Sequence, residues 1–384
     1  MYSIADYGAM IADRVRMSAF ERALDRAVTP GSVVIDIGTG TGIFALLACR
    51  RGARRVYAIE PDDAIQVARE IARANGCEDR IEFIQAKSTE VTLPERADVI
   101  VSDIGGILPW FQQHLASVAD ARRRLLAPEG VMIPQQDTVW AAVVDAPPLY
   151  ARHTGPWRAH ASGLDMEAAR RIVVNTVAKG QVTREQLLTP AQRWATLDYR
   201  SVEDLNVRTR ISWRIERPGT GHGFVAGFDR TVLDDVHLSN SPDAPETIRP
   251  ESIYGTLFFP WVDPVDLATG DCVTVDLAAT LVSEDYVWSW TTSVQGPDGT
   301  GKAAFTQSTF FGAPLAPAHL RKRAASYRPE LNEDGRIARV VLDAMDGGLT
   351  LGEIAARVSS RFSHRFARPE DTLRFVADLS QQYG

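Results

Sequence analysis

Apolar positions in the first third of the chain fall into short runs separated by longer amphipathic stretches. Between about residues 32 and 134 these segments include VVIDIG, FALLACRRG, VYAIE and AIQVAREIARANG. Strands separated by helices of about ten residues or more indicate a parallel sheet with crossover connections. We therefore predict an α/β domain over residues 1–134.

From about residue 135 the pattern changes to short strands in which apolar and polar residues alternate. Examples are TVWAAVV, TRISWRIE, CVTVDLAATLV and YVWSWTTSV, with Gly, Pro and Asp between them. This pattern predicts an antiparallel, barrel-like domain over residues 135–315. The stretch LDMEAARRIVVNTVAKGQVTREQLL predicts a helical insertion within residues 157–190.

The last part of the chain has apolar positions at three- and four-residue spacing, which predicts short amphipathic helices. Thr350 followed by Glu353 has the spacing of a capping box at a helix start. We expect a small helical domain over residues 329–384.

Composition narrows the class of protein without identifying its chemistry. The 384 residues are 45% hydrophobic and 24% charged, with a formal net charge of −7. That length favours two or three domains. The negative charge disfavours nucleic acid and anionic membranes as partners. The N-terminal stretch has no apolar segment of signal-peptide length, so a cytoplasmic location is expected. Three widely separated cysteines suit reduced core thiols, and no metal site is predicted.

The candidate chemistry begins at a glycine-rich turn after the first apolar run. Gly38, Gly40 and Gly42 allow backbone to approach a ligand where a Cβ would collide. Asp36 precedes the turn, and Glu60 closes the next strand, where its carboxylate can accept hydrogen bonds from ribose hydroxyls. This pairing predicts a nucleoside-binding crevice at the carboxyl ends of parallel strands.

The acid-x-Gly-x-Gly turn, without the further glycine of a dinucleotide fingerprint, resembles the first motif of class I S-adenosylmethionine-dependent methyltransferases. The resemblance implies S-adenosyl-L-methionine as the cofactor. A structural glycine turn in another doubly wound domain is the alternative interpretation.

Further segments over roughly residues 7–300 resemble the protein arginine methyltransferases, namely MIADRVRMSAF, GARRVYAIEPDD, STEVTLPERADVIVSD and RRLLAPEGVMIPQ. This resemblance implies a Rossmann-like, seven-stranded methyltransferase domain followed by a β-barrel-like domain. It also implies a helical dimerisation arm at about residues 157–190, and hence a homodimer.

The resemblance assigns roles at the cofactor site. Arg16 would pair with the methionine carboxylate, and Thr89 and Glu90 would lie near the adenine. A solvated arginine and solvated turn residues are the alternatives. The implied cofactor contacts are Met10, Arg16, Asp36, Gly38, Gly40, Thr41, Gly42, Glu60, Pro61, Thr89, Glu90 and Asp103.

The acceptor loop departs from the family pattern of two glutamates nine residues apart. Here the first acid is Asp103 and the second position is the neutral Gln112. A buried guanidinium needs its charge compensated, so arginine is a doubtful acceptor. The candidate catalytic residues are Asp103, Gln112 and His114, with His114 as a possible general base. A loop-capping carboxylate and a structural histidine are the alternatives.

Two other family features are missing. The family has a Thr-His-Trp loop, and the matching stretch Glu251-Ser252-Ile253-Tyr254 has no histidine. Asp13 therefore lacks the partner that the family pattern would give it. The tyrosine-bearing N-terminal helix of the family is absent or truncated, which leaves Tyr7 as the nearest aromatic residue.

The C-terminal segment resembles the small winged-helix, peptide-binding modules of the pyrroloquinoline-quinone D-protein type. The resemblance implies that this segment presents a peptide, with Leu342, Ile354 and Leu373 lining a groove. A plain helical appendage or a dimer element is the alternative.

These features predict a methyltransferase that acts on a peptide or protein, such as a ribosomally made precursor peptide. One alternative is a small-molecule O- or N-methyltransferase. The other is a catalytically inactive partner that keeps the cofactor fold.

Overall fold

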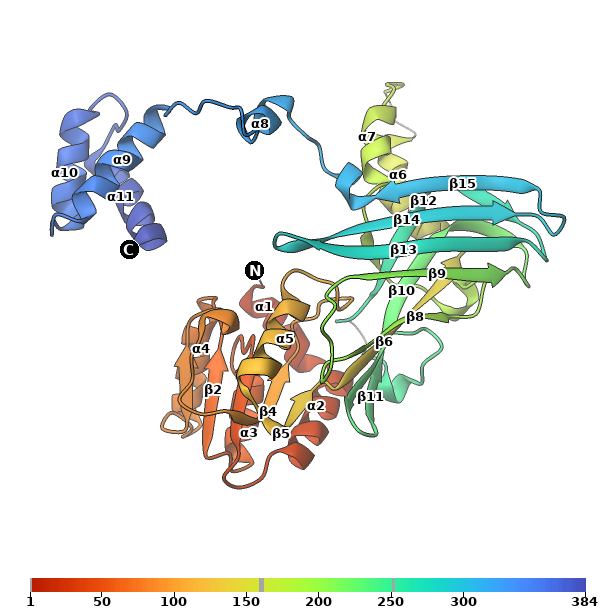
Figure 1. The fold of residues 1–384 in the computed structure, drawn as a ribbon, viewed down its shortest axis with the longest axis horizontal. Coiled ribbons are helices and arrows are strands. Elements are labelled where there is room, and N and C mark those ends of the chain that lie inside the picture. The colour runs from red at the N-terminus through yellow and green to blue at the C-terminus, as the bar shows by residue number, and fades with distance from the viewer. Residues whose placement is uncertain (1, 159–161, 251–252) are drawn as a thin grey trace. The chain divides into compact units, whose positions relative to one another are not determined.

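The computed structural model describes residues 2–158, 162–250 and 253–384. The chain forms two compact units, one ending at Pro314 and one comprising Leu315–Gly384, and each is described by itself (Figure 1). None of the described helices is long and apolar enough to cross a membrane.

The larger unit contains a sheet of parallel strands in the order β3-β2-β1-β4-β5. The strands are β1 (Val33–Ile37), β2 (Arg55–Ile59), β3 (Ile81–Ile84), β4 (Ala97–Ser102) and β5 (Leu126–Ile133), and the helices that connect them are α3 (Ile43–Arg50), α4 (Ala64–Ala74) and α5 (His114–Arg124). The predicted parallel sheet is confirmed. Because the strand order reverses between β1 and β4, their carboxyl ends mark the place where such sheets bind ligands.

The expectation of seven strands in this sheet is wrong for the described residues, which give it five. After Pro134 the chain enters β6 (Gln136–Val144), which pairs antiparallel with β10 (Gly219–Leu233) on one side and with β8 (Gln192–Asp198) on the other. Both hydrogen-bonding edges of β6 are therefore used in a second sheet, and β5 remains the edge of the first.

The N-terminal stretch, which includes the segment MIADRVRMSAF, forms two helices. They are α1 (Ile4–Ala12) and α2 (Arg14–Ala27). Asp13 lies between them, and its Oδ1 accepts a hydrogen bond from the backbone N–H of Arg16 at 3.0 Å. An aspartate in this position favours a new helix start because it satisfies a free backbone donor.

Two antiparallel sheets follow, one in the order β7-β12-β10-β6-β8 with β11 on β10, the other in the order β15-β14-β13-β9. The remaining strands are β7 (Ala178–Gly180), β9 (Val207–Arg214), β11 (Val236–Ser239), β12 (Thr256–Leu267), β13 (Cys272–Val282), β14 (Asp285–Gln295) and β15 (Gly301–Ser308). One apolar core contains residues from both antiparallel sheets and from β1 and β4. The predicted antiparallel strands are confirmed, and their core is continuous with that of the parallel sheet.

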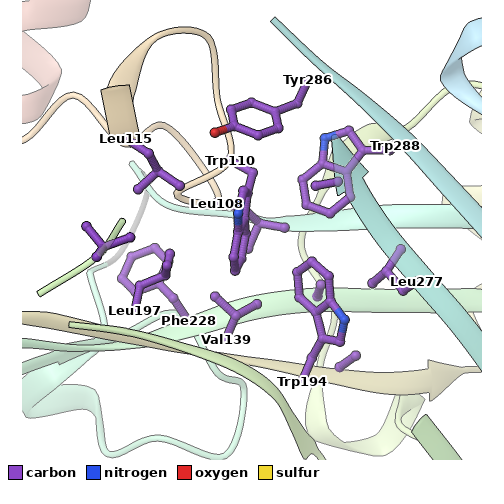
Figure 2. Packing of buried hydrophobic residues seen from close by; sticks show 14 of the residues in the cluster. Leu108, Trp110, Leu115, Val139, Trp194, Leu197, Phe228, Leu277, Tyr286 and Trp288 are labelled. Carbon is purple, nitrogen blue, oxygen red and sulfur yellow. The ribbon is translucent and has the colours of Figure 1, made fainter. Parts of the chain in front are cut away.

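A group of tryptophans joins the loop after β4 to this core. Figure 2 shows Trp110 of that loop packed against Trp194 of β8 and Trp288 of β14. The ring centroid of Trp110 is 4.7 Å from that of Trp194 and 6.3 Å from that of Trp288. Trp288 is buried in this core. The position of the loop after β4 therefore depends on strands far along the sequence.

The predicted helical insertion is only partly helical. Helix α6 (Pro147–Thr154) precedes it, and the elements within it include α7 (Glu167–Val173) and strand β7. Residues 159–161 lie outside the described part of the chain. After α7 the side chain of Thr176 donates to the carbonyl oxygen of Val173 at 2.7 Å, and that of Asn175 donates to the carbonyl oxygen of Arg171 at 2.8 Å. Such side-chain bonds to backbone, together with β-branched residues, compete with further helix.

The smaller unit consists of helices alone, α8 (Pro317–Lys322), α9 (Glu333–Met345), α10 (Leu351–Arg361) and α11 (Pro369–Tyr383). Thr350 and Glu353 form the predicted capping box at the start of α10. Residues 315–384 include no strand, so the wing of a winged helix is not formed. Ile354, expected in a groove, is 1% exposed and lies in the core shared by α9, α10 and α11.

The core of the smaller unit gives a direct test of its packing. Ile337 is fully buried in α9, and truncation to alanine is expected to destabilise the unit by about 2–4 kcal/mol. Native-state hydrogen exchange should then show loss of protection throughout α9, α10 and α11. The matched variant Leu373→Ala, at a side chain that is 43% exposed, should change protection little. Equal effects of the two variants would contradict this core.

Candidate cofactor and acceptor site

The turn that joins β1 to α3 is held in place by the carboxylate of Asp36. Asp36 Oδ2 accepts hydrogen bonds from Thr39 Oγ1 at 2.5 Å and from the backbone N–H of Ala45 at 3.0 Å. Burial nevertheless raises the pKa of Asp36 to about 7. Gly38 and Gly40 have φ values of 72° and 53°, which residues with a Cβ rarely adopt. The predicted glycine turn is therefore present as a preformed structure.

Glu60 follows β2 and lies beside this turn. Its Oε2 accepts the backbone N–H of Gly40 at 3.0 Å, and its Oε1 accepts the backbone N–H of Asp62 at 3.0 Å. Burial raises the pKa of Glu60. Each carboxylate oxygen has a second lone pair and can still accept a hydroxyl hydrogen. The geometry of Glu60 therefore fits the two neighbouring hydroxyls of a ribose.

Two side chains lie directly against the glycines. A Cβ at Gly40 would be 2.3 Å from Cε1 of Tyr7, and a Cβ at Gly38 would be 2.2 Å from Cγ2 of Ile104. Tyr7 belongs to α1, and burial together with the charge of Glu60 raises its pKa to about 12. The turn and Glu60 fit a nucleoside, and the Tyr7 ring lies against the turn at Gly40.

The other implied cofactor contacts differ in where they lie. Thr41 is buried in the glycine turn and Met10 is half-buried at the end of α1. Pro61 is exposed, and so are Thr89 and Glu90 in the short 3-10 turn after β3. No hydrogen bond links the side chains of these last three residues to the glycine turn within the part of the chain that the structure describes. Their role in binding remains a prediction.

Arg16 is buried and reaches toward the end of β4. Its Nε donates to Asp103 Oδ2 at 2.8 Å, and its Nη1 donates to the carbonyl oxygen of Met10 at 3.2 Å. The guanidinium lies over the rings of Phe20 and Phe44, 5.4 Å and 5.1 Å from their centroids. The alternative of a solvated arginine is therefore wrong. Among the described residues Nη2 has no hydrogen-bond partner, so it remains available to a carboxylate.

Asp103 follows β4 and accepts hydrogen bonds from three donors. Its Oδ1 accepts from Arg230 Nη1 at 2.8 Å, and its Oδ2 accepts from Arg16 Nε at 2.8 Å and from the hydroxyl of Tyr254 at 2.5 Å. Burial opposes ionisation, but the charges of Arg16 and Arg230 outweigh it and lower the pKa of Asp103 to about 2. Asp103 is therefore an ion-paired carboxylate and a poor proton acceptor.

Arg230 also forms a two-pronged ion pair with Asp137, its cross-strand partner on β6. Its Nε and Nη2 donate to the two carboxylate oxygens of Asp137, each at 2.8 Å. The Arg230 side chain is 2% exposed and the Asp137 side chain 0%. Tyr199 donates to Asp137 Oδ2 at 2.6 Å. We call these linked side chains the Asp103 network: Arg16, Asp103, His114, Asp137, Tyr199, Arg230 and Tyr254.

Sequence reasoning missed Arg230 and Asp137. The available signal was the presence of charged residues inside two otherwise apolar strands, GFVAGFDRTVL and QDTVWAAVV. Charged side chains are rarely buried unless they are paired, so two such strands indicate an internal ion pair. Only the register of β6 against β10 shows that the two residues face each other.

The structure places His114, a candidate base, inside the network. It is buried at the start of α5, and its Nε2 is 3.3 Å from the hydroxyl of Tyr199. Burial and the nearby charge of Arg230 lower the pKa of His114 to about 4. His114 is therefore neutral at physiological pH and shielded from solvent. This arrangement favours the structural interpretation over the catalytic one.

Gln112, the other candidate in the acceptor loop, is exposed and has a φ of 44°. Its backbone N–H donates to Asp285 Oδ1 at 3.1 Å, and Gln113 Nε2 donates to the carbonyl oxygen of Ser283 at 2.9 Å. The turn between β13 and β14 thus holds this end of the loop. No hydrogen bond joins Gln112 to Asp103 in the described structure.

The stretch matched to the family histidine lies partly outside the described residues, because Glu251 and Ser252 are not described. Tyr254 is described, and its hydroxyl donates a hydrogen bond to Asp103 Oδ2. Asp13, expected to lack a partner, uses Oδ1 to cap α2, while its buried Oδ2 has no hydrogen-bond partner among the described residues.

Comparisons with known proteins agree with this layout. Residues 19–145 match the family model of ribosomal protein L11 methyltransferase (PrmA), and residues 135–285 match that of the arginine methyltransferase oligomerization subdomain. The first match covers all five strands of the parallel sheet and the glycine turn. The second covers most of the antiparallel region.

Curated relatives include the probable protein arginine N-methyltransferase 6 of Arabidopsis thaliana, 30% identical over 229 residues that make up 57% of this chain and 52% of the relative. Protein arginine N-methyltransferase 1 of Dictyostelium discoideum is 27% identical over 273 residues, which are 69% of this chain and 78% of the relative. The chain thus spans about half the length of the first of these relatives.

A solved structure with the same fold is the Trypanosoma brucei PRMT1 enzyme-prozyme heterotetrameric complex with AdoHcy. It superposes with a TM-score of 0.70 at 22% sequence identity, covering 79% of this chain and 96% of that one. Together, the comparisons support the predicted scaffold, an S-adenosylmethionine-dependent methyltransferase of the protein arginine methyltransferase type.

The ion pair between Arg230 and Asp137 should dominate the effect of substitutions in the Asp103 network. Arg230→Met leaves Asp137 buried without its cation and is expected to cost about 3–5 kcal/mol of unfolding free energy. The double variant R230M/D137L should cost clearly less, because no unpaired buried charge remains. Urea unfolding of both variants measures the difference. A double variant as unstable as the single one would contradict the pairing.

His114 should make stability depend on pH in a defined window. Its pKa of about 4 in the fold lies below the value of about 6.5 for an unfolded chain, so the unfolded state takes up the proton first. The contribution of His114 to the unfolding free energy should therefore fall as the pH decreases from about 6.5 to about 4, opposite in sign to the contribution of Asp36, whose pKa is raised. His114→Gln should remove this contribution from the measured slope, and the exposed-site control His319→Gln should retain it. Urea titrations across the window test this, and equal slopes would contradict it.

Proposed function

We propose that this chain is an S-adenosyl-L-methionine-dependent methyltransferase that transfers a methyl group to a peptide or protein. The observation that carries the proposal is the glycine turn after β1, bonded to Glu60 through the N–H of Gly40 at 3.0 Å. It lies where the strand order reverses, which is where open α/β sheets bind nucleotides. The named relatives, which are protein arginine N-methyltransferases, support the same class of reaction.

The cofactor, when bound, supplies a methyl group carried on a positively charged sulfur. Glu60 would accept hydrogen bonds from its ribose hydroxyls, and the glycine turn would lie against the ligand without a Cβ in between. Arg16 would donate from Nη2 to the methionine carboxylate while its Nε stays on Asp103. Tyr7 would cover the ligand with α1, which excludes water from the site.

The C-terminal unit supports a peptide substrate. Helices α9, α10 and α11 share a core of their own, and Leu349, Leu351 and Leu373 remain exposed on it. An exposed apolar surface of this kind suits an apolar peptide segment. The resemblance to peptide-presenting modules favours the same assignment, although the unit is helical throughout. A small-molecule acceptor remains the competing assignment within the enzymes.

A homodimer formed through the helical arm is also part of the proposal. The match to an oligomerization subdomain over residues 135–285 includes α6 and α7. Next to these helices, Trp157 is 36% exposed and Leu164 is 62% exposed. Large apolar side chains of this kind are suited to a protein interface.

A catalytically inactive partner is the second candidate function. It is favoured by one observation, the contact of Tyr7 and Ile104 with the glycine turn that a cofactor would need. The similar structure of Trypanosoma brucei also comes from a complex of an enzyme with a prozyme. An inactive partner has no requirement for Glu60 beside the turn, which is why we rank it second.

Calorimetry with S-adenosylhomocysteine separates these functions. The full chain should give saturable heat, and Glu60→Ala should weaken binding about tenfold or more, because hydrogen bonds to a charged group are lost. The matched control is Glu82→Ala, at an exposed carboxylate on neighbouring strand β3, and it should bind as the unaltered chain does. Absence of heat from the full chain would leave the inactive-partner function in place of the proposed one.

A further inference from the structure

The guanidinium of Arg230 donates a hydrogen bond to Asp103, the carboxylate that is expected to contact the acceptor. Three donors already occupy its oxygens, at 2.8 Å from Arg230, 2.8 Å from Arg16 and 2.5 Å from Tyr254. A carboxylate offers about four acceptor positions, so little capacity remains for a substrate cation. Arg230 cannot turn away, because Asp137 would then be buried without a counter-charge.

The charges around Asp103 cancel. Arg16 and Arg230 are balanced by Asp103 and Asp137, and Gln112 adds no charge to the loop. The sulfonium of the proposed cofactor adds one positive charge to this neutral cluster. A guanidinium or ammonium acceptor would add a second, and two uncompensated cations in a desolvated site repel each other. An anionic acceptor would instead balance the sulfonium.

The network also lacks a group suited to take a proton from an acceptor. Asp103 has a pKa of about 2, which makes it a weak base. His114 has a pKa of about 4 and lies buried against the hydroxyl of Tyr199. A general base works best when its pKa is near the working pH. The network therefore offers no effective base for an amine or hydroxyl acceptor, which must lose a proton.

We infer that the acceptor is a carboxylate, converted to a methyl ester, and that Arg230 is the positioning residue that excludes cationic acceptors. This inference rests on the proposed methyltransferase function. A carboxylate oxygen forms a bond to the methyl carbon as the carbon–sulfur bond breaks. The electron pair of the broken bond stays on sulfur, which becomes a neutral thioether, and no proton moves. Aspartate or glutamate side chains and a peptide C-terminus offer the same chemistry.

The acceptor chemistry can be read from the stability of the labelled product. The full chain is incubated with S-adenosylmethionine labelled in its methyl group and a desalted macromolecular extract of the cells that carry its gene. Methyl esters release labelled methanol in mild alkali, whereas methylarginine survives acid hydrolysis. We expect the label to be volatile after alkali. Carboxypeptidase treatment before counting separates C-terminal esters from side-chain esters.

Two other outcomes overturn the inference in distinguishable ways. Label recovered as methylarginine or methyl-lysine would refute the carboxylate acceptor and leave the methyltransferase function intact. Label in no fraction, from a chain that binds S-adenosylhomocysteine, would refute the proposed function and the inference with it.

The role of Arg230 is tested by removing its guanidinium without leaving a buried charge. In R230M/D137L the ion pair is replaced by apolar side chains, and S-adenosylhomocysteine binding by calorimetry shows whether the cofactor turn is intact. The matched control R210M/D276L removes an exposed Arg–Asp pair between β9 and β13, joined at 2.7 Å. We expect R230M/D137L to retain cofactor binding but lose ester labelling about tenfold or more, because Asp103 then has one counter-charge fewer and repels an anionic acceptor.

If Arg230 had only a structural role, its replacement would not change which ions compete for the site. Propionate and methylguanidinium at equal concentration are therefore compared as inhibitors of labelling. We expect propionate to inhibit the unaltered chain and R210M/D276L more strongly than methylguanidinium does. In R230M/D137L the order should reverse, because Asp103 Oδ1 is then free for a cation. The same order and the same labelling in all three proteins would refute the assigned role.

Discussion

The bidentate ion pair of Arg230 with Asp137, extended to Asp103, connects the parallel sheet to the antiparallel sheet that contains β6 and β10. Arg230 and Asp137 are cross-strand neighbours in the antiparallel sheet, while Asp103 follows β4 of the parallel one. All three side chains are buried. Loss of the contacts between the sheets would therefore leave charges without partners inside the protein, which is energetically costly. The geometry of the acceptor site is therefore set by the same contacts that hold the fold together.

Packing around the network reinforces this coupling. Trp110 places the loop after β4 among tryptophans of β8 and β14, and Gln112 and Gln113 hydrogen-bond to the turn between β13 and β14. His114 joins the end of the loop to Tyr199. The loop is thus held at its middle and at its end by the antiparallel sheets. A site held in this way keeps its charge arrangement when a substrate arrives, which is how a preorganised site selects one charge type over another.

The cofactor turn and the acceptor site differ in what they require of the chain. The turn is built from local contacts, since Asp36 binds residues three and nine positions further along. Glu60 is 20 residues from Gly40. The acceptor site joins Asp103 to Arg230 and Tyr254, residues 127 and 151 positions away. We therefore expect the cofactor site of this scaffold to stay constant. Residues of the antiparallel sheets would determine which acceptor is methylated.

The sequence alone determined what depends on short-range pattern. The parallel sheet, the alternating strands, the glycine turn and the capping box at Thr350 were all predicted, because strand and helix periods and turn chemistry are readable within a few residues. The number of strands in the first sheet, the break between α1 and α2 and the end of α7 were missed, since competing pairings and caps decided them. Only the tertiary structure showed that Arg230 hydrogen-bonds to Asp103. Strand register sets which buried charges face each other, and one amino-acid sequence read in isolation does not specify that register.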